Sequence, residues 1–244
     1  MTSLHVLHLF PNELGINGDV GNVTALRHRA AAFGLDVETS VLGRGEKIPT
    51  GVDLVHIGSG PTAELLLVLP ELVRHSSQLK TLRDSGVPFL AISAGWFGLG
   101  ERIQFATGDW EPGAGVFPTE TQLLSSRVVG EIAIDTQWGI VTGFENHSAL
   151  VSDGGLAHFG RVTHGTGSDP RAAKSDRWEG VVMGSSIGTN MHGSLLPMNP
   201  VLADHLILSA IRRTVPNWTI PPTDSLAEVD AFAAKSRAAV LARL

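Results

Sequence analysis

Short apolar runs alternate with apolar positions at helical spacing through the first hundred residues. Four runs have the length typical of buried strands: residues 4–10, 37–42, 52–57 and 88–92. Between them, residues 23–33 and 63–82 carry apolar side chains at helical spacing, and Pro70 interrupts the second segment. This alternation predicts βαβ units, and therefore an α/β fold with a mostly parallel sheet flanked by helices.

The second half of the chain is less regular. Residues 101–180 are rich in Gly, Thr and Ser, and the strand-like pieces are residues 131–135, 140–142 and 181–187. Residues 203–213 have a helical pattern, and the Pro-containing residues 216–222 are typical of a linker. Beyond the linker, Ser225 and Glu228 form a capping-box signature ahead of a second helical stripe that ends at Leu244. We therefore predict a main domain over residues 1–215, followed by a linker and C-terminal helix over residues 216–244.

Composition narrows the class of protein. The 244 residues include 43% hydrophobic and 17% charged residues, as in a chain that buries a substantial core. The net charge of −6 argues against a general nucleic-acid or anionic-membrane partner. The chain has no cysteine, so it has no disulfide, no thiolate metal site and no thiol nucleophile. Without a signal-like N-terminus or an apolar run of about 20 residues, the expected location is cytoplasmic.

Ser93 stands in the segment Ala91-Ile92-Ser93-Ala94-Gly95, directly after a predicted strand and before a predicted helix. The segment is similar to the G-x-S-x-G elbow of α/β-hydrolases, with alanine in place of the first glycine. Such an elbow holds a nucleophile in a strained turn at the carboxyl edge of the sheet. The alternative is an ordinary strand-to-helix turn in which the serine caps the helix.

Two further polar clusters follow apolar strands. The loop Gly58-Ser59-Gly60 follows residues 52–57 and mimics a G-x-G-x-x-A dinucleotide fingerprint, but it follows the third strand and no acid stands at the spacing expected for the ribose. Such a loop can instead offer backbone N–H groups to an oxyanion. His192 follows another apolar strand in a Gly-rich turn, where a general base is well placed. The sequence contains no metal-binding His-Glu-x-x-His pattern and no phosphate-binding P-loop, so we predict neither a metal nor a nucleotide on this chain.

Together these motifs resemble the class I glutamine amidotransferases of the CobB/CobQ type over residues 4–212. The residues that carry the resemblance are Asp19, Asn22, Gly58, Gly60, Ser93, Glu145, Asn146, His147 and His192. The resemblance implies the flavodoxin-like architecture of that class. It also implies a glutaminase subunit that supplies ammonia to a Mur-ligase-family (MurT-like) partner, which would bind ATP and metal and amidate the D-glutamate of lipid II.

The same resemblance implies roles for individual residues. Ser93 occupies the position of the catalytic cysteine, and His192 that of its base. Arg127 corresponds to the glutamine-binding arginine. The substrate-binding set would also include the oxyanion loop and the residue after the nucleophile: Gly58, Ser59, Gly60 and Ala94.

The chain departs from the family pattern at several positions. Serine replaces the cysteine at Ser93, and Phe97 and Leu65 replace two expected glutamines. Ser194 occupies the position at which many class I enzymes carry a third, acidic residue. An engineered Cys→Ser exchange would explain Ser93 alone, whereas natural divergence explains Phe97 and Leu65 as well.

Three functions stay open at this point. The first is an active glutaminase subunit, and the second is an inactive pseudo-amidotransferase that serves as a structural or regulatory partner of the ligase. The third is a serine hydrolase that uses Ser93, His192 and an intervening acid, either Glu145 or Asp169.

Overall fold

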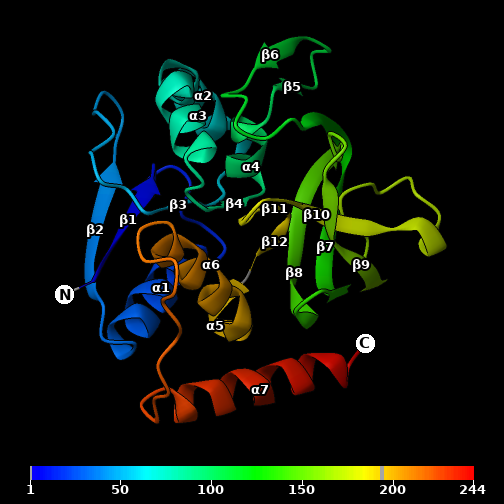
Figure 1. Cartoon of the computed structure of the whole chain (residues 1–244). Helices are drawn as coiled ribbons and strands as arrows, with labels where there is room; N and C mark the ends of the chain where they lie inside the picture. The colour runs from blue at the N-terminus through cyan, green and yellow to red at the C-terminus, as the bar shows by residue number, and fades with distance from the viewer. Residues whose placement is uncertain (1, 193–194) are drawn as a thin grey trace.

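The computed structural model describes residues 2–192 and 195–244. In these residues a mixed sheet of twelve strands crosses the molecule, and helices cover it on both sides (Figure 1). The strands are β1 (Ser3–Leu9), β2 (Asp36–Leu42), β3 (Leu54–Ile57), β4 (Phe89–Ile92), β5 (Arg102–Gln104), β6 (Trp110–Pro112), β7 (Glu120–Thr136), β8 (Gly139–Val151), β9 (Ala157–His164), β10 (Trp178–Met183), β11 (Ser186–Thr189) and β12 (Met191–His192). The helices are α1 (Val20–Ala32), α2 (Thr62–Arg74), α3 (Ser76–Asp84), α4 (Ala94–Leu99), α5 (Leu195–Met198), α6 (Pro200–Arg212) and α7 (Ala227–Leu241), with a 3-10 turn at Lys174–Asp176.

The sheet has a parallel and an antiparallel part. Strands β2, β1, β3, β4 and β11 pair in parallel in that order. The sheet then continues through β10, β9, β7, β8 and β12, which pair in antiparallel fashion. The predicted α/β fold is confirmed. Strand β4, which ends directly before Ser93, lies inside the parallel part and is buried on both faces, as parallel strands commonly are.

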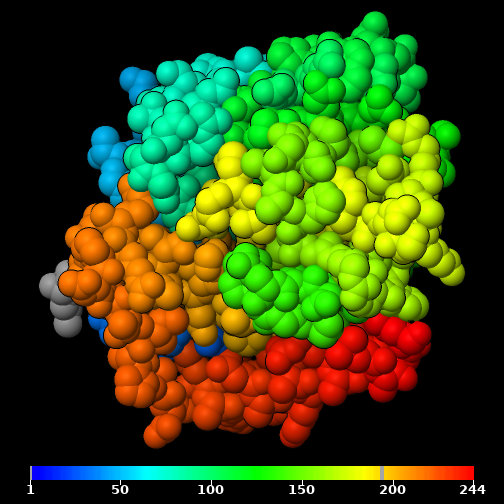
Figure 2. Space-filling model, turned by 45° about the vertical axis from the view of Figure 1, so that its right-hand side comes forward, coloured from blue at the N-terminus to red at the C-terminus, as the bar shows by residue number. Residues whose placement is uncertain are grey.

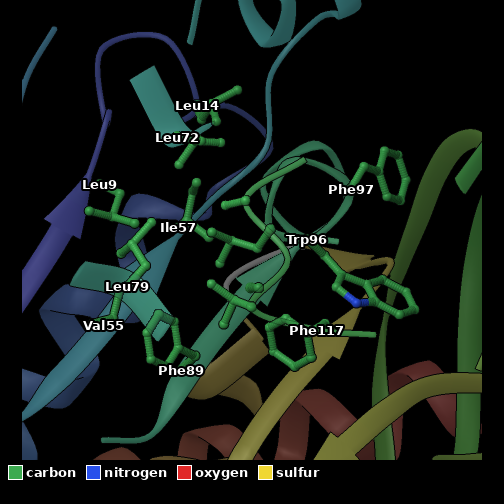
Figure 3. Packing of buried hydrophobic residues seen from close by; sticks show 14 of the residues in the cluster. Leu9, Leu14, Val55, Ile57, Leu72, Leu79, Phe89, Trp96, Phe97 and Phe117 are labelled. Atoms are coloured by element: carbon green, nitrogen blue, oxygen red, sulfur yellow. The ribbon is translucent and has the colours of Figure 1, made fainter. Parts of the chain in front are cut away.

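Alternate side chains of the parallel strands form two separate cores. On β1, Leu7 and Leu9 pack with the helices α2, α3 and α4, whereas Leu4 and Val6 pack with α1, α5 and α6. Figure 3 shows larger members of the first core, including Phe89 of β4. Because both faces of β1, β3 and β4 are covered, their sequences are largely continuous apolar runs, which made them easy to predict.

Three predicted elements differ from the structure. The helical segment 63–82 continues through Pro70 and breaks instead at His75, between α2 and α3. The apolar run 181–187 is a hairpin, since β10 turns into β11 at Gly184, which has φ +59°. The pieces 131–135 and 140–142 belong to a far longer hairpin, β7–β8, in which some exposed positions are apolar (Val129, Ile140) and some buried positions are polar (Glu145, His147).

The C-terminal helix α7 lies along one edge of the molecule, against α5 and β8 (Figure 2). Its predicted capping box is wrong, because Leu226 is the N-cap residue and no side chain caps the helix. Its apolar stripe is also shifted. Ala233 and Val240 are buried, but Val229 is exposed, and the polar Asp230 and Arg237 face the domain instead. The predicted boundary at residue 215 stays a prediction.

Candidate functional site

Ser93 occupies a strained turn between β4 and α4. Its backbone has φ +46° and ψ −114°, a region that a residue with a Cβ atom rarely adopts and that costs on the order of 1–3 kcal/mol. The Ser93 N–H donates to the carbonyl of Thr189 on β11 at 2.7 Å, which holds the turn in place. The Ser93 side chain does not cap α4, so the capping alternative does not describe this turn. The geometry is that of a nucleophile elbow.

Gly95 allows the elbow to sit directly on the loop Gly58–Gly60. A Cβ atom at Gly95 would lie 2.4 Å from the carbonyl oxygen of Gly58, a distance that no real contact shows. The Gly95 N–H donates to the same oxygen at 3.1 Å. Next to it, the Ala94 N–H makes a long contact of 3.4 Å with the Ser59 hydroxyl. The structure thus brings together the elbow and the loop that the sequence predicted as partners.

A cavity of about 650 Å³ opens above Ser93. Its size lies within the range of small-molecule sites. The side chains Leu65, Phe97, Phe105 and Leu123 form an apolar part of its wall. Polar groups come from Ser59, Arg127, Asn146, His147 and Ser148. Leu65 and Phe97, which replace the two expected glutamines, therefore both border this cavity.

Arg127 and Asn146 form a polar pair on the wall of the cavity. Arg127 Nε donates to Asn146 Oδ1 at 2.8 Å, and Asn146 Nδ2 contacts Asn17 Oδ1 at 3.5 Å. Arg127 lies on β7 and Asn146 on β8, and these two strands pair in antiparallel fashion with a register shift after Leu123. The guanidinium is the only Lys or Arg cation among the described residues that line the cavity, which also include the acidic Asp109 and Glu111.

His192 is fully buried on β12, three residues after Thr189, whose carbonyl accepts the Ser93 N–H. Its Nδ1 lies 3.3 Å from Oδ2 of Asp19, which is also fully buried. Its Nε2 has no hydrogen-bond partner among the described residues. The same Asp19 oxygen accepts the Ser59 N–H at 2.9 Å. Asp19 thus links the histidine to the loop that packs under the elbow.

The other residues of the family motifs have different surroundings. Glu145 accepts the N–H groups of Thr166 and Gly167 at 2.8 and 2.9 Å, so both of its oxygens bind backbone. His147 is buried in the cavity wall, and its Nε2 lies 3.9 Å from Oε2 of Glu145. At this distance the two atoms are not hydrogen-bonded, and neither ring nitrogen has a hydrogen-bond partner within the described residues.

Asn22 and Asp169 lie apart from the cavity lining. Asn22 Oδ1 accepts the Leu196 N–H at 2.9 Å and so anchors α5 against α1. The acid beside His192 is Asp19. Neither of the two predicted candidates, Glu145 and Asp169, takes that place, and Asp169 instead accepts the Arg171 N–H. Ser194 lies outside the described residues.

Sequence reasoning missed Glu179, a fully buried carboxylate on β10. Its oxygens accept hydrogen bonds from the hydroxyls of Ser168 and Thr189 and from the Asn190 N–H. Burial raises the pKa of Glu179 above its usual range, and the nearby His147 opposes that shift. Because Thr189 and Asn190 precede His192, this carboxylate fixes the chain that carries the histidine. A glutamate between Trp178 and Gly180 in the sequence carries no signal of such a role.

Neither a metal site nor a membrane-spanning segment emerges from the described residues. No group of three His, Asp or Glu side chains in this part of the chain could hold a metal ion. Likewise, none of its helices is long and apolar enough to cross a bilayer.

A strained elbow on a parallel strand, a buried histidine and a Gly-rich loop define the site of a class I glutamine amidotransferase fold. The chain matches the family of CobB/CobQ-like glutamine amidotransferase domains over residues 8–200, and it belongs to that family.

The chain is similar in sequence to two characterised subunits and similar in fold to two solved structures. The chain is 30% identical to the lipid II isoglutaminyl synthase (glutamine-hydrolyzing) subunit GatD of Staphylococcus aureus, over 95% of this chain and 94% of that protein. It is 26% identical to the GatD subunit of Streptococcus pneumoniae, over 86% and 81% of the two chains. PurLQS from Thermotoga maritima (TM-score 0.57, 14% identity, covering 88% of this chain and 100% of that one) shares the fold. The CTPS glutaminase domain of Trypanosoma brucei shares it as well (TM-score 0.54, 12% identity, covering 90% of this chain and 97% of that one).

Proposed function

We propose that this chain is the glutamine-hydrolysing subunit of a two-subunit ligase of the lipid II isoglutaminyl synthase type. Its partner is a MurT-like ligase that binds ATP and the lipid-linked acceptor, receives ammonia from this subunit and amidates D-glutamate. The reaction takes place in the cytoplasm, where ATP for the ligase is available. The observation that carries the proposal is the strained Ser93 at the floor of a cavity whose wall holds one guanidinium, Arg127.

Binding of glutamine uses the two ends of the cavity. The Arg127 guanidinium, oriented by Asn146, pairs with the α-carboxylate of the substrate. The side-chain amide then extends toward Ser93. The N–H groups of Gly60 and Ala94 are the donors for the developing oxyanion. The Ser59 N–H is held by Asp19 at 2.9 Å, whereas the Ala94 N–H makes only a long contact of 3.4 Å with the Ser59 hydroxyl, which the oxyanion would replace.

Hydrolysis proceeds in two balanced steps. Ser93 Oγ bonds to the amide carbon, its proton passes to His192 Nε2 and then to the leaving nitrogen, and the C–N bond breaks to release ammonia. Water then attacks the resulting ester, regenerates the hydroxyl and releases glutamate. The ammonia is the product that the ligase consumes.

The test is ammonia release from L-glutamine by the wild type, Ser93→Cys and Ser93→Ala, each with and without the ligase. We expect turnover by the wild type with the ligase, faster turnover by Ser93→Cys, and none by Ser93→Ala. Arg127→Met should raise KM more than it lowers kcat, because it removes a contact made in the ground state. Inactivity of both the wild type and Ser93→Cys with the ligase would refute glutamine hydrolysis.

An alternative function is favoured by one specific observation. Leu65 and Phe97 line the cavity with apolar surface at the positions where the family carries glutamines. A pocket that no longer recognises glutamine would make this chain a pseudo-amidotransferase, a structural or regulatory partner of a ligase that uses free ammonia. Calorimetry separates the two functions, since the alternative requires tight association with the ligase and no heat of glutamine binding.

A further inference from the structure

We infer that Asp19 is the positioning acid of a Ser93–His192–Asp19 triad, and that this triad makes the serine hydroxyl a working nucleophile. The inference rests on the proposed function for Ser93 as the attacking group, but it does not depend on glutamine as the substrate. It supplies the acidic member that the sequence lacks at Ser194, from a residue that precedes His192 by 173 positions.

The first argument is the tautomer of His192. An ionised carboxylate only accepts hydrogen bonds, so the contact of 3.3 Å between Asp19 Oδ2 and His192 Nδ1 places the ring proton on Nδ1. Nε2 then carries the lone pair. This nitrogen is buried and has no hydrogen-bond partner within the described residues. No hydrogen bond joins this nitrogen to Ser93 Oγ in the structure, and His192 is not among the residues that line the cavity. A buried acceptor without a partner is unfavourable, and a base that receives the Ser93 proton when the two side chains approach accounts for it.

The second argument is the way in which Asp19 itself is held. Its Oδ2 also accepts the Ser59 N–H, and its backbone carbonyl contacts His56 Nε2 at 3.1 Å. A Cβ atom at Gly58 would come within 2.9 Å of the Asp19 Cβ, so the loop packs closely against the acid. Asp19 is thus held at Oδ2 and at its backbone, while Oδ1 has no hydrogen-bond partner among the described residues. An acid held in this way gives the imidazole one orientation, which is what a hydroxyl nucleophile needs from its base.

The third argument is connectivity. Ser93 N–H donates to the carbonyl of Thr189, three residues before His192, and Ala94 contacts the hydroxyl of Ser59. The nucleophile, the base and the acid therefore belong to one hydrogen-bonded framework. Their order along the chain is acid, serine, histidine, which differs from the order in α/β-hydrolases, where the serine comes first.

The test uses a fluorophosphonate probe on the full chain. The Ser93 oxygen bonds to phosphorus, fluoride leaves, and the hydroxyl proton passes to His192; mass spectrometry identifies the modified residue. We expect labelling of Ser93 in the wild type and a rate at least about 100-fold lower in Asp19→Asn, since loss of the acid costs serine triads about 10⁴-fold. The matched control is Asp53→Asn, because Asp53 also accepts a backbone N–H, at 3.0 Å from His5, but lies outside the site. This control should label at the wild-type rate.

A second measurement separates positioning from a structural role. The burst of p-nitrophenolate from p-nitrophenyl acetate reports acylation of both oxygen and sulfur nucleophiles, and Ser93→Ala supplies the background. Because a thiol ionises far more readily than a hydroxyl, Asp19→Asn should slow the burst about 100-fold with Ser93 and less than about 10-fold in the Ser93→Cys chain. If Asp19→Asn does not fold, Asp19→Ser keeps an acceptor for the Ser59 N–H and removes the charge.

The outcomes distinguish this inference from the proposed function. Equal losses in the serine and cysteine chains would overturn the positioning role, and an unlabelled wild type would overturn the working serine. Labelling of Ser93 that depends on Asp19, without ammonia release from glutamine, would uphold the triad and refute the glutaminase instead.

Discussion

Glu145 offers the sharpest test of how the site is supported. Its side chain is 2% exposed, and its two oxygens accept the N–H groups of Thr166 and Gly167. Glu145→Gln keeps one acceptor and turns an NH₂ group toward the other N–H. One charge-assisted bond, about 1.5–3 kcal/mol, is then lost, and a buried donor is left unpaired. Burying an amide costs less than burying a carboxylate, so we expect a net loss of about 2–3 kcal/mol.

The assay is urea-induced unfolding, and the chain offers a matched control. Glu120→Gln makes the same exchange in the Arg102–Glu120 pair, whose side chains are 49% and 36% exposed. Such an exposed pair contributes about 0–1 kcal/mol. The free energy of unfolding of Glu145→Gln should therefore fall well below that of Glu120→Gln. A difference between the two variants under about 0.5 kcal/mol would refute the argument that Glu145 holds the loop at residues 165–167.

Three further predictions concern the rest of the molecule. Arg29→Met removes the cation that joins Asp204 of α6 to Asp230 of α7. Because these carboxylates are 25% and 41% exposed, the free energy of unfolding should fall by about 2 kcal/mol, less than for a fully buried pair, and the amides of α7 should exchange hydrogen faster. Unchanged exchange there would count against this anchor. Gly95→Ala forces a Cβ against a backbone carbonyl, and it should cost about 1–3 kcal/mol in urea unfolding and abolish fluorophosphonate labelling; normal labelling would contradict the close packing. Burial, with a smaller effect of nearby His56, lowers the pKa of His8 to about 3, so the unfolded chain takes up a proton below pH 6.5 that the folded chain resists. Between pH 7 and pH 5, His8 should lower the free energy of unfolding of the wild type by about 2 kcal/mol, and His8→Gln should lack this contribution. If the unfolding free energies of the wild type and His8→Gln depend on pH in the same way, the lowered pKa of His8 is disproved.

Much of the parallel part of the fold was predictable from local pattern. Strands β1 and β4 are buried on both faces, so they are short apolar runs, and α1 has its apolar positions at helical spacing. The elbow at Ser93 was predictable for the same reason, because small residues directly after a buried strand indicate a tight turn. These features depend on residues within about ten positions of one another.

Other local signals were outweighed by packing. The hairpin β7–β8 exposes the apolar Val129 and Ile140 and buries the polar Glu145 and His147, so its strands lacked the apolar pattern that would have indicated their length. The helix α2 accommodates Pro70 because its buried residues Leu65, Leu69 and Leu72 hold it against the core. Propensity is a weak guide where tertiary burial provides most of the stability.

The residues of the site came from the sequence, but their partners did not. The motifs indicated Ser93, His192 and Arg127, and the acid beside the histidine was sought at Glu145 or Asp169. It is Asp19, the residue before α1, and it meets His192 although β1 and β12 lie near opposite ends of the strand order. Local sequence encodes which stretches become strands, helices and turns, since those depend on near neighbours. A contact across 173 residues depends on the order of strands in the sheet, and no spacing along the chain expresses that order.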